Sequence, residues 1–148
     1  MRLYLSSFDL GYCPKELVAL AGAARRAAII VNALDNRPEG RAHWLKEQTN
    51  KLVSLGFSVV ELDLRSYFGA TDKLKGFLSS IDLVWINGGN AFILRRAMKQ
   101  SGFDLLSRLT VLRAMSRPLK CEMKEQSYPR FVIATIRLGF IYLASAPS

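Results

Sequence analysis

Gly88, Gly89 and Asn90 are the residues best placed for chemistry in this sequence, because they separate a short apolar segment from a helical pattern. Two consecutive glycines permit a sharp turn in which backbone N–H groups approach a ligand without interference from Cβ atoms. Residues 91–101 predict a helix that Asn90 opens and caps, with its positive N-terminal end at the same turn. The pattern favours binding of a carboxylate, a phosphate or a developing oxyanion, although such glycines can also serve only to make the turn.

Alternating strand and helix patterns surround this turn. Apolar segments predict strands at 2–6, 27–33, 57–64 and 83–87. Helical patterns cover 14–20, 41–55 and a short segment capped by Thr71 or Asp72 and ending at Leu78, whereas 35–40 is typical of a turn. This alternation predicts an α/β fold of three layers, with a doubly wound, mostly parallel sheet. Ligands of such folds bind beyond the carboxyl ends of the strands, where Gly88 and Gly89 lie.

Composition narrows the class of protein. With 148 residues, of which 50% are hydrophobic, we expect a single domain with a substantial core. No apolar run reaches the length of a membrane span, so we expect no membrane contact and a cytoplasmic location. The net charge of +9 comes from isolated basic pairs and alternating charges, which argues against nucleic acid. Cys13 and Cys121 lack metal-type spacing, and we expect no disulfide, metal or cofactor.

The segment around the glycine turn resembles the signature of the peptidase E family, which are serine peptidases of the class I glutamine-amidotransferase-like superfamily. The similar residues are 86–92, 94–98 and 102–103, joined by 1–8, 29–35, 55–57 and 61–68. The resemblance extends over about residues 1–115 and implies a flavodoxin-like, class I glutamine-amidotransferase-like fold. It also implies a serine-type peptidase that releases N-terminal Asp from short acidic peptides.

The resemblance assigns Gly88 and Gly89 to the oxyanion or the substrate carbonyl, with Asn90 opening the helix. The family's nucleophile lies on a Gly-x-Ser-Ala-Gly elbow, followed by a histidine base and an acidic partner. This sequence contains neither Gly-x-Ser-x-Gly nor Gly-x-Cys-x-Gly. Ser145 is the candidate nucleophile, and Cys121 is a thiol near the expected place of the elbow.

The remaining polar residues near strand ends have structural explanations. His43, the sole histidine, precedes the glycine turn and does not match the family's base, so we interpret it as a surface or half-buried helix residue. Asp35, Asp63 and Asp82 lie near the ends of predicted strands, where aspartate is an ordinary turn or cap residue. The sequence therefore lacks a complete catalytic triad, and we expect no hydrolysis above background.

Residues 116–148 form an atypical tail, for which a frameshift or premature stop and a shortened, non-catalytic paralogue are alternative explanations. We expect part of 131–143 to fill a slot in the sheet, with 116–130 as an irregular loop; the alternative is a homodimer through the open sheet edge. Three functions stay open. They are a serine peptidase, a non-catalytic module that binds small anions, and a non-functional fragment stabilised by a partner chain.

Overall fold

The computed structural model describes residues 2–6, 9–10, 14–23, 25–107 and 132–136. These residues form a five-stranded sheet in the order β1-β5-β4-β2-β3, and every described pair of strands is parallel. The strands are β1 (Arg2–Ser6), β2 (Arg26–Ile30), β3 (Ser58–Glu61), β4 (Leu83–Ile86) and β5 (Val132–Ile136). The helices are α1 (Pro14–Ala21), α2 (Pro38–Ser54), α3 (Thr71–Leu78) and α4 (Ala91–Ser101), with short 3-10 helices η1 (Asn32–Leu34) and η2 (Leu64–Tyr67).

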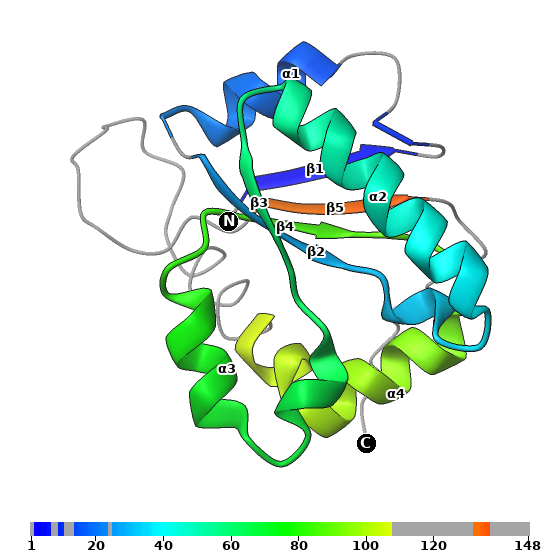
Figure 1. The fold of residues 1–148 in the computed structure, drawn as a ribbon. Helices are drawn as coiled ribbons and strands as arrows, with labels where there is room; N and C mark the ends of the chain where they lie inside the picture. The colour runs from blue at the N-terminus through cyan, green and yellow to red at the C-terminus, as the bar shows by residue number, and fades with distance from the viewer. Residues whose placement is uncertain (1, 7–8, 11–13, 24, 108–131, 137–148) are drawn as a thin grey trace, which may run out of the picture.

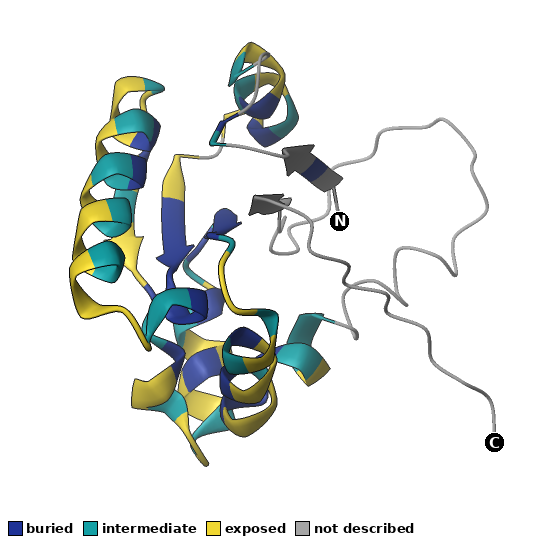
Figure 2. Ribbon diagram, turned by 90° about the vertical axis from the view of Figure 1, so that its right-hand side faces the viewer, coloured by how far each residue is buried: buried dark blue, intermediate teal, exposed yellow. Residues whose placement is uncertain are grey.

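Helices cover both faces of the sheet, with α1 and α2 on one side and α3 and α4 on the other (Figure 1). Alternate residues of β2 enter opposite cores, because successive strand side chains point to opposite faces. Ala27 and Ile29 join the core beneath α1 and α2, whereas Ala28 and Ile30 join the core above α3 and α4. Both central strands β2 and β4 are buried (Figure 2). The predicted three-layer α/β fold with a parallel sheet is therefore confirmed.

The expected slot in the sheet is filled by β5, which lies between β1 and β4 (Figure 1). Val132 pairs with Arg2, and Ala134 pairs with both Tyr4 and Trp85. The prediction that part of 131–143 occupies this slot is confirmed for residues 132–136. Residues 116–130 and 137–143 lie outside the described part of the chain.

Two predicted strands are shorter than their apolar patterns. The strand predicted at 27–33 ends at Ile30, and the chain turns into η1. The strand predicted at 57–64 ends at Glu61 and is followed by η2. Ala33 and Leu64 are buried in the core above α3 and α4 although neither belongs to a strand. An apolar run alone does not distinguish a strand from a buried turn, which explains both errors.

Helix starts also differ from the sequence pattern. α2 begins at Pro38 instead of 41, because proline fits the first helical turn, and this shortens the turn predicted at 35–40. The N-cap of α3 is Ala70, not Thr71 or Asp72, and the Thr71 hydroxyl instead donates to the Ser101 carbonyl at 3.3 Å. No helix within the described residues is both long and apolar enough to cross a membrane.

Candidate functional site

The glycine turn connects β4 to α4 and packs tightly against η1. Gly89 has a positive φ of 156°, and a Cβ atom there would lie 2.7 Å from the Ala33 carbonyl oxygen and 2.9 Å from Leu34 Cδ2. The Asn90 N–H donates to that same Ala33 carbonyl at 2.8 Å. The Asn87 N–H donates to the Ile30 carbonyl at 2.8 Å, so the ends of β4 and β2 are bonded together. A glycine is therefore required at position 89 by packing as well as by backbone conformation.

Asn90 caps α4, as predicted from the sequence. Its side-chain oxygen accepts from the Phe92 N–H at 3.0 Å and the Ile93 N–H at 3.2 Å. Gly102, with a φ of 77°, ends the same helix in the left-handed conformation, which is also as predicted. The cap satisfies two of the N–H groups that the start of a helix leaves without partners inside the helix.

The backbone N–H groups of Gly88, Gly89 and Ala91 make no hydrogen bond to any described residue. Their neighbours Asn87, Asn90, Phe92 and Ile93 all donate within the protein. Around this helix start, the N–H groups without an acceptor among the described residues are thus those of the turn itself and of the first residue of α4. Their number and placement suit a small anion better than an extended chain of phosphates.

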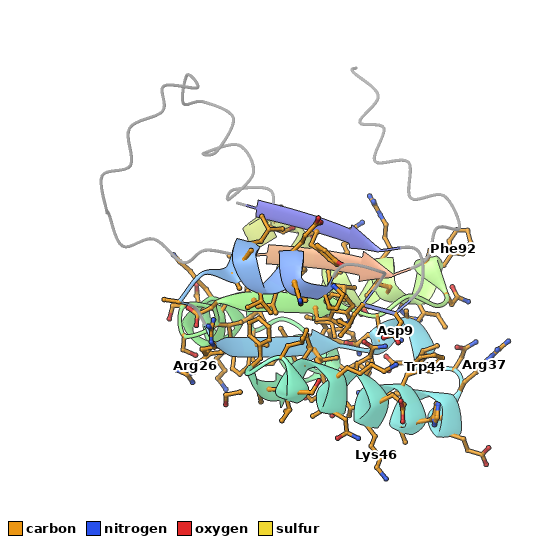
Figure 3. The ribbon with its side chains drawn as sticks, turned by 90° about the horizontal axis from the view of Figure 1, so that it is seen from above. Asp9, Arg26, Arg37, Trp44, Lys46 and Phe92 are labelled. Atoms are coloured by element: carbon orange, nitrogen blue, oxygen red, sulfur yellow. The ribbon has the colours of Figure 1, made fainter. Side chains whose placement is uncertain are left out.

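An open cleft of about 290 Å³ lies beside these donors. One wall comes from η1 and the turn after it, namely Ala33, Leu34, Asn36 and Arg37. The second wall comes from the glycine turn, namely Gly89 and Asn90. Arg37 is exposed and forms no ion pair with any described residue. Figure 3 places Arg37 beyond the carboxyl ends of the strands, with Arg26 at the opposite end of the sheet. The cleft is therefore lined by Gly89 of the glycine turn and by an arginine that pairs with no described residue.

The η1 wall of the cleft is held by a polar cluster centred on Asn32 and Arg41. Asn32 is fully buried; its Nδ2 donates to Asp35 and Asp63, both at 2.9 Å, and its Oδ1 accepts from the Leu64 N–H at 3.0 Å. Arg41 pairs with Asp35 at 3.0 Å, with Asp63 at 3.2 Å and with Glu61. Because these contacts join η1, β3, η2 and α2, they fix the position of the wall that Ala33 and Leu34 present to Gly89.

Asp63 is the strongly perturbed acid of this cluster. Burial alone would raise the pKa of Asp63, but hydrogen bonds from Arg65, Asn32 and the Arg65 backbone N–H outweigh burial and hold its pKa well below the usual range. Arg65 reaches the carboxylate through Nη2 at 2.7 Å and Nε at 3.0 Å. Asp63 is therefore ionised at neutral pH and acts as an anchor, not as a proton donor.

A second polar contact holds the loop that follows β1. Asp9 accepts from the buried Gln48 at 3.1 Å and pairs with Lys51, and both partners belong to α2. Burial would raise the pKa of Asp9, but the hydrogen bonds from Lys51 and Gln48 lower it overall. The Asp9 carboxylate thus joins the chain after β1 to α2 at the carboxyl edge of the sheet (Figure 3). The cluster around Arg41 joins the chain after β2 to α2 in the same way.

The other residues singled out from the sequence have structural positions or fall outside the described residues. His43 is exposed on α2, and its ring lies edge-on to the Trp44 ring, with 5.5 Å between the two ring centroids. Asp82 accepts from the backbone N–H groups of Arg25 and Arg26 at the amino end of β2. Ser145, Cys121 and Cys13 lie outside the described residues. Within those residues, no group of three or more His, Cys, Asp or Glu side chains is placed to hold a metal ion.

Sequence reasoning missed Arg37, Asn32 and Arg41. Arg37 lies between turn residues and Pro38, where a basic side chain carries no pattern of its own. Apart from Asp35, the partners of Asn32 and Arg41 are 20 to 32 positions away in sequence, from the end of β3 to the start of η2. A polar residue inside an otherwise apolar run was the available signal, because a buried asparagine needs hydrogen-bond partners.

One solved structure with the same fold is a candidate peptidase E protein from Listeria monocytogenes EGD-e. The two chains superpose with a TM-score of 0.64 and 19% sequence identity, over 91% of the present chain and 58% of the other. The present chain thus spans a little over half the length of that protein, and the likeness establishes a shared fold. No protein-family model and no curated protein matches this sequence.

Proposed function

We propose that this chain is a peptidase E-like protein of the serine-peptidase type, whose glycine turn binds the substrate carbonyl of short peptides with an N-terminal Asp. The observation that carries the proposal is the set of N–H groups at Gly88, Gly89 and Ala91 that have no acceptor among the described residues and lie at the capped start of α4, at the carboxyl edge of the sheet. Two adjacent N–H donors are the usual means of stabilising an oxyanion in acyl transfer. The shared fold with a candidate peptidase E supports the class of reaction.

The same proposal includes the absence of a complete catalytic triad. The His43 imidazole forms no hydrogen bond with a described residue and lies exposed on α2. A general base must reach its nucleophile directly or through one water, and the sequence holds no second histidine and no Gly-x-Ser-x-Gly elbow. We therefore infer that this chain binds such peptides at Gly88 and Gly89 and turns them over no faster than background.

Arg37 favours a second candidate function, the non-catalytic binding of small anions. Arg37 lines the cleft and pairs with no described residue, and its guanidinium, once turned toward the cleft, would offer a two-pronged contact to a carboxylate or a phosphate. In a peptide complex the Arg37 guanidinium would bind an acidic side chain or the terminal carboxylate of the peptide. In an anion-binding module it would meet the ligand itself, with the N–H groups of the turn on the other side.

The test is to measure binding and hydrolysis of an Asp-Leu dipeptide, of acetate and of inorganic phosphate by the full chain. We expect the dipeptide to bind without turnover and Arg37→Ala to weaken binding by roughly tenfold. Lys46→Ala is the control, because Lys46 is exposed on α2 and forms no ion pair with a described residue. Binding of acetate and phosphate without the dipeptide would favour the anion-binding module, and binding of none would contradict both functions.

Two outcomes concern catalysis specifically. Turnover of Asp-Leu that disappears in Ser145→Ala would show a working serine nucleophile and contradict the missing triad. Turnover that disappears in Cys121→Ala would show a thiol mechanism. Gly89→Ala is unsuitable as a binding control, because its Cβ would collide with the Ala33 carbonyl and disturb the fold.

A further inference from the structure

The outer face of α4 carries an apolar and basic stripe formed by Phe92, Arg95, Arg96 and Lys99. These residues follow one another at intervals of three, one and three, so they share one side of the helix. All four are exposed, whereas Leu94, Ala97 and Ser101 on the opposite side are buried. Phe92 is 88% exposed, more than any other large hydrophobic side chain in the described residues.

The cations of this stripe form no ion pair within the part of the chain that the structure describes. Arg95, Arg96 and Lys99 form no ion pair with a described residue, and α4 contains no acidic residue. Lys99 follows Arg95 by four positions and Arg96 by three, and like charges at these spacings repel one another on a helix surface. The helix therefore keeps a locally unfavourable charge pattern beside an exposed aromatic ring, a combination that an acidic partner would relieve.

We propose that this stripe is a docking surface for an acidic segment of a partner protein, with an apolar side chain of that segment packed on Phe92. Charge complementarity selects the partner, because three cations that pair with no described residue on one helix face attract a segment that carries carboxylates. From Phe92 to Lys99 the stripe is about 10 Å long, the length of about three residues of extended chain. An exposed aromatic anchor flanked by arginines is the composition typical of interface hot spots.

The geometry favours a protein segment over nucleic acid. Single-stranded nucleic acids are held by successive aromatic platforms beside a basic groove, and this stripe has one aromatic side chain on a convex helix. The stripe begins two residues after Asn90, so it adjoins the cleft without using the N–H groups of the turn. Phe92 and Arg37 both lie at the carboxyl end of the sheet and point away from the body of the protein (Figure 3).

The experiment titrates the full chain into a fluorescein-labelled peptide in which one Leu is flanked on both sides by runs of Glu, and measures anisotropy at low salt. We expect Arg95→Glu combined with Arg96→Glu to weaken binding by more than roughly tenfold. Phe92→Ala should weaken binding by roughly fivefold, with no loss in melting temperature, since the side chain is exposed.

The matched control is Lys15→Glu combined with Lys46→Glu, which changes the net charge equally at exposed sites on α1 and α2. Equal weakening by this control would overturn the proposal, because bulk charge alone would then explain binding. Absence of peptide binding, or tighter binding of a single-stranded oligothymidine through the same residues, would also overturn it. Asp-Leu binding should be unaffected by the Arg95 and Arg96 changes, so the outcome is separable from the proposed function.

Discussion

Arg41 and the arginines of α4 use the same side-chain chemistry for opposite purposes. Arg41 is half-buried and pairs with three carboxylates that come from η1, β3 and the start of η2. Arg95 and Arg96 are exposed, and neither is paired with a described residue. The first arrangement joins backbone segments, whereas the second leaves its charge available to a ligand.

The comparison extends to the two sides of the cleft. On the η1 side, Asn32 uses both ends of its amide within the protein, and Asp63 is held ionised by its partners. On the glycine-turn side, the N–H groups of Gly88, Gly89 and Ala91 have no described acceptor. A wall whose polar groups are bonded within the protein therefore faces a wall whose N–H groups have no described acceptor, an arrangement that suits the proposed binding site.

The largest expected effect separates the two kinds of arginine. Arg41→Ala should lower the free energy of unfolding by about 2 kcal/mol, because it leaves three neighbouring carboxylates without their shared cation. Arg95→Ala should change it by less than about 0.5 kcal/mol, since an exposed and unpaired side chain is removed. Urea unfolding of both variants measures the difference. Equal losses would show that the two arginines do not differ in structural role.

The second prediction compares two glycines. Gly89→Ala should lower the free energy of unfolding by about 2 kcal/mol, because its Cβ would press on the Ala33 carbonyl and its φ is positive. Gly76→Ala, inside α3 with no atom within 4 Å of the added Cβ, should raise it by roughly 0.5 to 1 kcal/mol. Thermal unfolding of the pair checks this. A stable Gly89→Ala protein would contradict the tight packing of the turn on η1.

The third prediction concerns pH. The folded pKa of Asp63 lies below its unfolded value, so its contribution to stability is complete above about pH 4 and is lost as the pH falls through the folded pKa. Asp63→Asn removes that contribution at every pH. The stability difference between the native chain and this variant should therefore shrink as the pH falls below about 4. Parallel unfolding curves over this range would show that Asp63 does not anchor the cluster.

Much of the fold was predictable from the sequence because its core segments are locally consistent. β2 and β4 are continuous apolar runs, and the sequence carries both the start signal of α4, Asn90, and its stop signal, Gly102. The placement of residues 132–136 in the sheet followed from their apolar character and from the space that a parallel sheet leaves between β1 and β4. The predicted ends of two strands were wrong at η1 and η2, where the tertiary contact between Asn32 and Leu64 ends the strands.

The candidate site was only partly predictable. The glycine turn and the Asn90 cap depend on neighbouring residues, and local patterns found them. Arg37 and the Asn32–Arg41 cluster depend on contacts between segments that are distant in sequence, which no local pattern encodes. The unused N–H groups could be identified only after every neighbouring donor had been matched with its acceptor.

The central claim is that the N–H groups of Gly88, Gly89 and Ala91 bind the anionic or carbonyl group of a ligand. Its most direct test is to follow backbone amide signals of the full chain by nuclear magnetic resonance during titration with N-acetyl-aspartate. The account predicts the largest shifts at Gly88, Gly89 and Ala91, and smaller shifts at Asn90 and Phe92, whose N–H groups already have acceptors. Shifts absent from the glycine turn, or centred on another part of the molecule, would contradict it.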